Sequence, residues 1–276
     1  MEQTVAKAFR LLEALAAHEE PQRVTELSRE LGMAKSNVHR LLQTLIGLGY
    51  ARQDQQGLYQ ASLRMWERGA NVLAHQTVHQ VAHDHLTRLA AATGEQVNLA
   101  VLDGGEMLYI ATVEAAHGKR GRSMLGQRVL GRRAPLHGVA TGKVILAYQS
   151  DAVMRAAAKQ LHAVTPRTIT TVERLRAELA EIRRSGFAMN LGEWRGGVHG
   201  IAAPIAAPDG VMSAALSIAG PAERLQARRL RTLAPLVVET AGAVALDWAY
   251  ATAGADTPDR ARRPVAPAPR TPVGAE

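Results

Sequence analysis

The chain has 276 residues, a formal net charge of +8 at pH 7 and no cysteine. Its length favours two domains, and a hydrophobic content of 47% is sufficient for packed cores. The lack of cysteine excludes disulfides, thiolate zinc sites and cysteine nucleophiles, and it fits a cytoplasmic protein. No run of apolar residues approaches the length of a membrane span, so we expect no membrane partner.

The N-terminal part of the chain is predicted to form a helix-turn-helix followed by a wing. An amphipathic first helix precedes a short helix that is capped by Thr25 and ends at Leu31. Gly32 provides a tight turn before a second helix at 35–47, and two short strands flank a polar turn at 54–57. This order of elements is typical of a winged helix-turn-helix that docks on DNA.

The helix at 35–47 has one apolar face and one face suited to DNA. Its apolar residues recur at positions i, i+3, i+4 and i+7 from Val38 and predict the buried face. No acidic residue lies between Glu30 and Asp54, which suits insertion into the groove of a polyanion. A solvated helix face without a partner is the alternative. The residues predicted to contact DNA are Thr25, Lys35, Ser36, Asn37, His39, Arg40, Gln43 and Arg52.

The positive charge of the chain does not lie in this domain. Residues 1–60 contain seven Lys or Arg and seven Asp or Glu, so their formal charges cancel. A single copy should therefore bind DNA weakly, and we expect two copies held at a fixed spacing.

A continuous helix is predicted over 62–93, comprising a linker helix and the first helix of a second domain. His75, His79 and His83 would share one face of it, at a spacing that zinc sites use. Nothing else in the sequence completes a tetrahedral set of ligands, so a solvated or interhelical face is the preferred interpretation and no metal is expected.

The second domain begins with a predicted hairpin, in which strands at 96–102 and 106–113 flank the turn Asp103-Gly104-Gly105. Residues 115–150 then contain no acid and seven basic residues, which are Lys119, Arg120, Arg122, Arg128, Arg132, Arg133 and Lys143. This segment is a solvated loop, an electrostatic funnel for an anionic small molecule or a DNA patch.

A helix with small residues opens within 135–148. The segment lacks the Gly-x-x-x-x-Gly-Lys-Ser/Thr spacing of a phosphate loop, which argues against nucleotide hydrolysis. Its exposed N–H groups could hold a carboxylate. Further helices are predicted at 151–161, 171–185 and 221–251, and strands at 187–190, 201–206 and 211–218. No catalytic constellation emerges, so we expect neither an enzyme nor a cofactor.

Four separated motifs, in the same order, resemble the IclR family of bacterial transcription regulators. They are MAKSNVHRLLQTLIGLGYARQD, APLHGVATGKVILA, TPRTITTVERLRAELAEIRRSGFAMNLGEWRGGVHGIAAPI and AALSIAGP. The resemblance covers about residues 3–250. It implies an α+β protein with a winged helix-turn-helix domain (1–61), a linker helix (62–80) and an effector-binding and oligomerisation domain (81–251). That last domain would have a curved antiparallel sheet flanked by helices. Residues 252–276 lie outside the resemblance, and their composition predicts a disordered basic tail.

The resemblance also implies a function. It predicts a ligand-responsive repressor or activator of a catabolic operon, whose partners are double-stranded operator DNA, a small organic carboxylate and further copies of the chain. A DNA-binding oligomeric scaffold without a small-molecule ligand is the alternative. Carried over by motif, the polar or small effector-binding positions are Ala140, Thr141, Asn190, Gly200, Ser217 and Ala219. The apolar walls would come from Ala134, Val198 and either Val129 or Leu130.

Three of these positions depart from the family pattern. Asn190 stands where many relatives carry Asp, and Gly200 and Ala219 are smaller than in some relatives. We therefore expect a pocket that is roomier than one fitted to a two-carbon acid, and an effector that is an aromatic or larger carboxylate.

Overall fold

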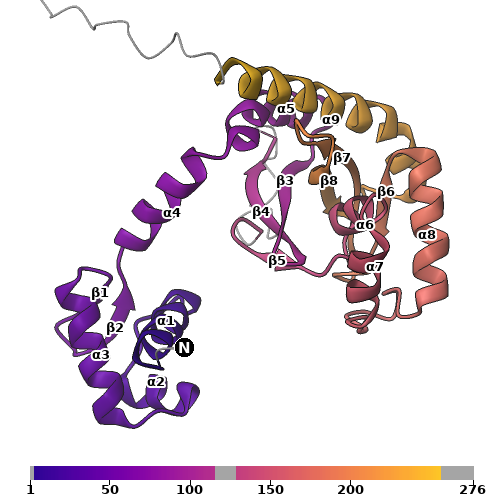
Figure 1. The fold of residues 1–276 in the computed structure, drawn as a ribbon. Coiled ribbons are helices and arrows are strands. Elements are labelled where there is room, and N and C mark those ends of the chain that lie inside the picture. Colours follow the sequence, from indigo (N-terminus) through magenta and orange to yellow (C-terminus); the bar gives the residue numbers. More distant parts are fainter. Residues whose placement is uncertain (1–2, 116–128, 256–276) are drawn as a thin grey trace, which may run out of the picture. The chain divides into compact units, whose positions relative to one another are not determined.

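The structure is a computed structural model that describes residues 3–115 and 129–255. The chain forms two compact units, which divide between His75 and Gln76. Each unit has its own hydrophobic core. The ribbon in Figure 1 follows the elements of both units.

The N-terminal unit is a three-helix domain with a two-stranded wing and a following helix. Its elements are α1 (Gln3–Ala17), α2 (Val24–Leu31), α3 (Lys35–Gly47), β1 (Ala51–Gln53), β2 (Tyr59–Ala61) and α4 (Arg64–Ala74). The buried face of α3 is the predicted one, which begins at Val38, and it packs with Leu11 and Leu27 of the first two helices. Gly32 ends α2 with a φ of +62°, as a tight turn requires. The winged helix-turn-helix is therefore confirmed.

One cap in this unit was predicted wrongly. Helix α2 begins at Val24, so Thr25 lies inside its first turn rather than at its cap. Arg23 occupies the cap position, and its backbone N–H donates to the Glu26 carboxylate at 2.7 Å. The carboxylate side chain thus satisfies a backbone donor at the helix start, which is half of a capping box.

The continuous helix predicted over 62–93 is wrong. Helix α4 ends at Ala74, and a separate helix α5 (Thr77–Thr93) follows. Gln76 has extended backbone angles (φ −85°, ψ 100°), which interrupt the helical hydrogen-bond ladder. His75 therefore does not share a helical face with His79 and His83. Within residues 3–115 and 129–255, no three His, Cys, Asp or Glu side chains gather as they would around a metal ion.

The C-terminal unit is built on a six-stranded antiparallel sheet with the order β5-β4-β3-β8-β7-β6. Its strands are β3 (Gln96–Asp103), β4 (Glu106–Val113), β5 (Arg133–Ala134), β6 (Ala188–Leu191), β7 (Val198–Ala206) and β8 (Met212–Pro221). The β3–β4 hairpin closes through Gly104 and Gly105, whose φ values of +59° and +85° suit a two-residue turn. The expected curved antiparallel sheet is confirmed, whereas the short edge strand β5 was not predicted.

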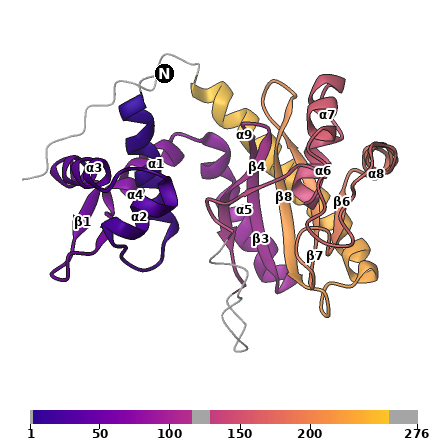
Figure 2. The ribbon, with the colours of Figure 1, turned by 90° about the horizontal axis from the view of Figure 1, so that it is seen from below.

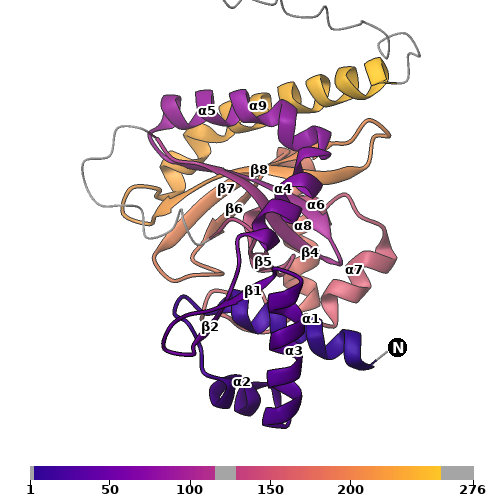
Figure 3. The ribbon, with the colours of Figure 1, turned by 90° about the vertical axis from the view of Figure 1, so that its left-hand side faces the viewer.

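Helices cover both faces of this sheet (Figures 1, 2 and 3). Helices α5 and α9 (Ala227–Ala255) lie side by side on one face. The other face carries α6 (Ala140–Leu146), with α7 (Asp151–Ala158) and α8 (Val172–Ser185) beyond it. The predicted cap Thr171 accepts a hydrogen bond from the backbone N–H of Arg174 at the start of α8.

The last helix begins later than predicted. Pro221 is the final residue of β8, where it pairs with Val198, so α9 starts only at Ala227. It then extends to Ala255, beyond the predicted end at 251. The rest of the predicted basic tail, including Arg260, Arg262, Arg263 and Arg270, lies outside the described residues.

Part of α9 resembles a membrane span in composition alone. Among the described residues, Ala227–Ala253 is the segment long and apolar enough to cross a membrane, with a mean hydropathy of 1.2. One side of the helix is packed, however, because its buried residues recur at helical spacing against the sheet and α5. They are Leu230, Ala234, Val237, Ala241 and Val244. A core helix of a packed domain meets the same test of length and composition.

Gly142→Ala is expected to lower the melting temperature of the C-terminal unit. An added Cβ would overlap the backbone of Leu136, which cannot move aside, and such overpacking costs about 1–3 kcal/mol or more. Differential scanning calorimetry measures the change. Gly242→Ala in α9 is the matched control: its Cβ would meet no atom within 4 Å, so it should stabilise by up to about 1 kcal/mol. Equal melting of the two variants would contradict the close approach at Gly142.

Candidate functional site

A cavity of about 380 Å³ lies in the C-terminal unit. It lies between the sheet, the start of α6 and the loop that follows β6. Its volume falls within the range of small-molecule sites in proteins. Its lining includes the polar residues Gln96, Asn98, Tyr109, Arg132, Thr141 and Arg195.

The floor of the cavity follows from the strand register. One row across the sheet places Asn190, Gly200, Ala219 and Gln96 side by side on β6, β7, β8 and β3. In the second row, Ser217 pairs with Asn98, which pairs with Thr112. Since alternate residues of a strand share a face, Gln96 and Asn98 both lie on the cavity side of β3. Four strands therefore supply the floor.

A short chain of hydrogen bonds runs along this floor. The Gln96 side-chain nitrogen Nε2 donates to Asn98 Oδ1 at 2.6 Å, and the Thr112 hydroxyl donates to the same oxygen at 2.9 Å. Gln96 Oε1 is buried and accepts no hydrogen bond from the described residues. The Ser217 hydroxyl lines the cavity and is likewise not hydrogen-bonded to any described side chain or backbone group.

The start of α6 forms another part of the wall. Ala140 and Thr141 line the cavity, and the Thr141 hydroxyl lies 3.1 Å from the hydroxyl of Tyr109. Burial raises the pKa of Tyr109, against the lowering effects of Thr141 and of the positive charge of Arg195. Tyr109 is therefore a neutral hydrogen-bonding group at physiological pH. Helix α6 has only seven residues, so its own dipole is a minor source of positive potential.

Arginines supply the positive potential of the cavity. Arg133 is ion-paired with the Asp103 carboxylate, which compensates its charge. Arg132 and Arg195 also line the cavity, and neither forms an ion pair with a described residue. No Asp or Glu belongs to the cavity lining among the described residues. The arrangement therefore favours an anionic ligand.

The basic residues of segment 115–150 thus lie in different environments. Arg132 and Arg133 lie at the cavity, and Lys143 is fully buried in an ion-paired cluster. Lys119, Arg120, Arg122 and Arg128 lie outside the described residues.

Lys143 connects the segments that carry the cavity wall. Its ammonium lies 2.8 Å from Glu178 Oε1 on α8 and 2.8 Å from Glu193 Oε2 in the loop after β6. The next two residues of that loop, Trp194 and Arg195, line the cavity. Burial raises the pKa of Glu193, the charge of Lys143 opposes that rise, and the negative charge of Glu178 adds to it. One ammonium is thus shared by two carboxylates in a mainly buried cluster.

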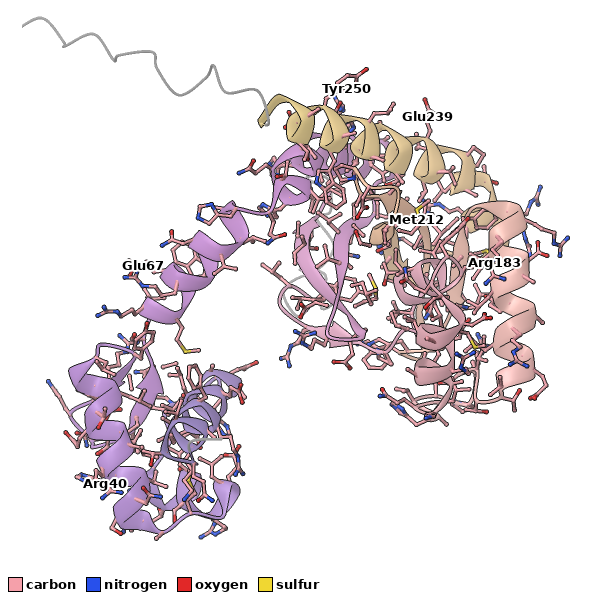
Figure 4. The ribbon with its side chains drawn as sticks, in the orientation of Figure 1. Arg40, Glu67, Arg183, Met212, Glu239 and Tyr250 are labelled. Carbon is pink, nitrogen blue, oxygen red and sulfur yellow. The ribbon has the colours of Figure 1, made fainter. Side chains whose placement is uncertain are left out.

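The DNA-contacting residues predicted from the sequence lie on the N-terminal unit. Lys35, Ser36, His39, Arg40 and Gln43 are exposed on α3, and Asn37 is half-buried on the same helix. Figure 4 shows Arg40 at the outer surface of this unit. Thr25 and Arg52 are exposed on α2 and β1. The exposed face of α3 thus carries donors and acceptors of the kind that read base edges.

Comparison with known protein families decides what kind of protein carries these two sites. The model described as "IclR helix-turn-helix domain" matches residues 4–55. The model described as "Bacterial transcriptional regulator IclR C-terminal" matches residues 70–246, which is more than half of the chain. The chain belongs to the IclR family. It is a DNA-binding transcriptional regulator rather than an enzyme.

Individual relatives extend over most of this IclR-family chain. The HTH-type transcriptional regulator XynR of Escherichia coli is 33% identical over 219 residues, covering 78% of this chain and 85% of XynR. KdgR of the same organism is 31% identical over 250 residues, covering 90% and 93%. The crystal structure of Thermotoga maritima IclR superposes with a TM-score of 0.74 at 28% identity, covering 91% of this chain and 100% of that one.

A further solved structure contains a ligand. It is an IclR homolog from Microbacterium hydrocarbonoxydans complexed with 4-hydroxybenzoate. It matches with a TM-score of 0.75 at 26% identity, covering 89% of this chain and 98% of that one.

The structure brings nearly all predicted effector-binding residues of this IclR-family regulator to one cavity. The residues that line it are Val129, Ala134, Ala140, Thr141, Asn190, Val198, Gly200, Ser217 and Ala219. Leu130 does not line it and is 53% exposed.

Two of the predicted cavity residues, Asn190 and Gly200, also have structural roles that the sequence did not indicate. Asn190 donates to the Gly138 carbonyl at 2.7 Å and accepts from the N–H groups of Gly192 and Glu193, so its polar atoms are already occupied. At Gly200 an added Cβ would lie 2.7 Å from the Ile218 carbonyl oxygen. Glycine is therefore required there by strand packing, independently of any room that it leaves for a ligand.

Ten lining residues were not predicted from the sequence to bind an effector. They are Gln96, Asn98, Tyr109, Arg132, Arg133, Val139, Trp194, Arg195, His199 and Ile218. A usable signal existed for two of them. Gln96 and Asn98 are polar residues at alternate positions of an otherwise apolar strand, a pattern that marks a polar site on a buried face.

Glu193→Gln is expected to raise the melting temperature of this regulator more at pH 8 than at pH 5. Because folding raises the pKa of Glu193, its stabilising contribution is present at low pH and is lost as the pH rises through the folded pKa. Glutamine removes that loss, while Glu178 still neutralises Lys143. A relative gain of about 2–4 °C between the two pH values corresponds to roughly 1 kcal/mol.

Scanning fluorimetry across this pH range measures the effect. Glu239→Gln is the control, since Glu239 lies on the outer side of α9 (Figure 4) and is exposed. A gain that is the same at pH 5 and pH 8 would show that Glu193 is not the titrating group.

Proposed function

We propose that this regulator controls a catabolic operon in the bacterial cytoplasm and changes its operator affinity when a small organic carboxylate occupies the cavity. The observation that carries the proposal is the charge of that cavity. Arg132 and Arg195 line it without ion-pair partners among the described residues, and its lining contains no described carboxylate. A carboxylate ligand would compensate both cations.

The identity of a relative's ligand supports an aromatic acid as one member of this class. The IclR homolog from Microbacterium hydrocarbonoxydans was solved with 4-hydroxybenzoate, at a fold similarity that spans nearly the whole chain. The apolar wall residues Ala134, Val139, Trp194 and Val198 could contact a hydrocarbon or aromatic body.

Oligomerisation is the second part of the proposal. The N-terminal unit has no net formal charge over residues 1–60, so a single copy lacks a general attraction to DNA. The same unit exposes large apolar side chains on two helices, which are Val5 and Phe9 on α1 and Trp66 and Val72 on α4. These faces are suited to pairing with a second copy, in a homodimer or within a homotetramer. Two linked copies would bind an operator much more tightly than one.

Regulation then follows from linkage. A carboxylate that binds one arrangement of the oligomer more tightly than another shifts the population toward that arrangement. Operator DNA, in turn, favours the arrangement in which both winged helix-turn-helix domains fit the duplex. The effector therefore represses or activates according to which arrangement it prefers.

Arg40→Ala is expected to abolish retention of operator DNA in a gel-shift assay. Arg40 is the exposed cation at the middle of the α3 face, and loss of a bidentate or phosphate contact in both copies weakens binding by at least about tenfold per contact. Arg184→Ala is the matched control, because Arg184 is an exposed arginine of the C-terminal unit. Retention of operator DNA by Arg40→Ala at wild-type concentrations would refute docking through α3.

A panel of carboxylates tests the effector part of the proposal. Acids that fit the cavity should raise the melting temperature and change operator affinity, and Arg132→Gln or Arg195→Gln should weaken their binding by roughly 10–100-fold. Arg184→Gln should leave binding unchanged. A response limited to glyoxylate- and pyruvate-sized acids would contradict the larger effector. No response to any acid, with operator binding intact, would favour the ligand-free scaffold.

A further inference from the structure

Helix α4 is attached to the winged helix-turn-helix domain rather than standing apart from it. Its Met65 side chain packs against the hydrophobic core of that domain. The compact N-terminal unit accordingly extends to His75 and includes the whole of α4. The sequence indicated a different division, with a DNA-binding domain that ends at residue 61 and a separate linker helix from residue 62. The connection at residues 61–64 therefore decides whether α4 moves independently of the domain.

Ser62 closes this connection with three hydrogen bonds. Its backbone N–H donates to the Tyr50 carbonyl at 2.9 Å, and its hydroxyl donates to the Gly49 carbonyl. The same hydroxyl accepts from the backbone N–H of Arg64 at 3.2 Å, in the first turn of α4. The residue between β2 and α4 is thus bonded both to the turn after α3 and to the start of α4.

The Arg64 side chain adds a contact to the same turn. Its guanidinium carbon lies 5.4 Å from the centroid of the Tyr50 ring, which is a cation–π geometry. The guanidinium also lies against Gly49, where an added Cβ would come within 2.9 Å of the Nη1 atom. Together with Ser62 and Met65, Arg64 fixes the direction in which α4 leaves the domain.

The other end of α4 is built differently. The helix ends at Ala74 and Gln76 has extended backbone angles, so no helical hydrogen-bond ladder runs through residues 75 and 76. Beyond this break, α5 is packed into the C-terminal unit from its first turn, since Val78 and Ala82 are buried. Hinges in proteins are short element-terminal segments of this kind, which absorb changes of φ and ψ between two packed bodies.

We propose that the winged helix-turn-helix domain and α4 form one rigid body, and that this body turns about a hinge at His75 and Gln76. The inference deepens the proposed function, on which its regulatory part rests. The arrangements among which an effector selects then differ in the angle at this hinge, and α4 carries that difference to the DNA-binding surface.

Helix α4 acts in this mechanism as a lever arm. An α-helix rises about 1.5 Å per residue, so the 11 residues of α4 span about 16 Å, and a turn of about 10° at the hinge moves its far end by about 3 Å. Paired DNA-binding domains fit half-sites only at a fixed spacing. A displacement of this size in each copy therefore changes the fit, whereas a hinge at residue 62 would turn the domain without this displacement.

Double electron–electron resonance on the full-length protein tests the inference. Because the chain has no cysteine, spin labels attach only at the positions chosen for them. One pair, Glu13→Cys with Asn71→Cys, joins α1 to α4 within the rigid body. The other pair, Asn71→Cys with Ala91→Cys, spans the hinge from α4 to α5. All three residues are exposed, and dilution with unlabelled protein restricts the signal to distances within one copy.

We expect a narrow distance distribution for the first pair and a distribution at least about twofold wider for the second. Operator DNA should narrow the second distribution and leave the first unchanged, because half-sites at a fixed spacing select one hinge angle.

Arg64→Ala should widen the distribution of the first pair, since it removes the contact with Tyr50 that holds α4. Arg68→Ala is the matched control and should leave that distribution unchanged, because Arg68 lies on the same helix and pairs with the adjacent Glu67. Both arginines are exposed, so neither change removes a core contact.

Two results would overturn the inference. If the first pair gives a distribution as wide as the second, α4 moves at residue 62 and is not part of a rigid body. If both pairs give equally narrow distributions with and without operator DNA, there is no hinge at His75 and Gln76. Neither result bears on carboxylate binding in the cavity, which the panel of acids measures separately, and a failure of that panel leaves the hinge distances unchanged.

Discussion

The cavity of this regulator depends on one buried cation. Lys143 has no exposed side-chain surface, and a buried ammonium is tolerated only when it is paired. Its partners Glu178 and Glu193 come from α8 and from the loop after β6, so one side chain joins three segments that are distant in sequence. The residues on either side of these contacts, Thr141 before Lys143 and Arg195 after Glu193, line the cavity. The position of the wall therefore follows from this ion-paired cluster.

Other buried polar groups fix the remaining sides in the same way. Asn190 ties the loop of Glu193 to the segment before α6 through three hydrogen bonds. Glu95, which directly precedes Gln96, is buried and paired with Arg224 in the turn before α9 and with Arg229 in the first turn of α9. The end of β3 is thus anchored from the opposite face of the sheet. A site surrounded by such anchors is preorganised, so a ligand meets groups that are already oriented.

The two units rely on different physics. The N-terminal unit is held by an apolar core among three helices, and it presents its polar residues outward on α3. Its lack of net charge means that affinity for DNA must come from specific contacts and from duplication rather than from general attraction. In the C-terminal unit most of the polar groups of the site are buried. Because buried groups are shielded from water, each unpaired polar atom there costs free energy. A small ligand can therefore act on this unit with a small number of contacts.

The sequence by itself determined the elements whose causes are local. The apolar spacing from Val38 predicted the buried face of α3, and the two glycines after Asp103 predicted the hairpin, because both signals lie within a few residues. The motif resemblance likewise predicted nine of the nineteen described lining residues of the cavity, although it included the exposed Leu130. The interruption at Gln76 escaped the periodicity, since apolar spacing continues across it. Only the tertiary structure brought Gln96, Arg132 and Arg195 to one cavity and left Gln96 Oε1 without a donor, because strand register and burial are set by contacts between segments far apart in the chain.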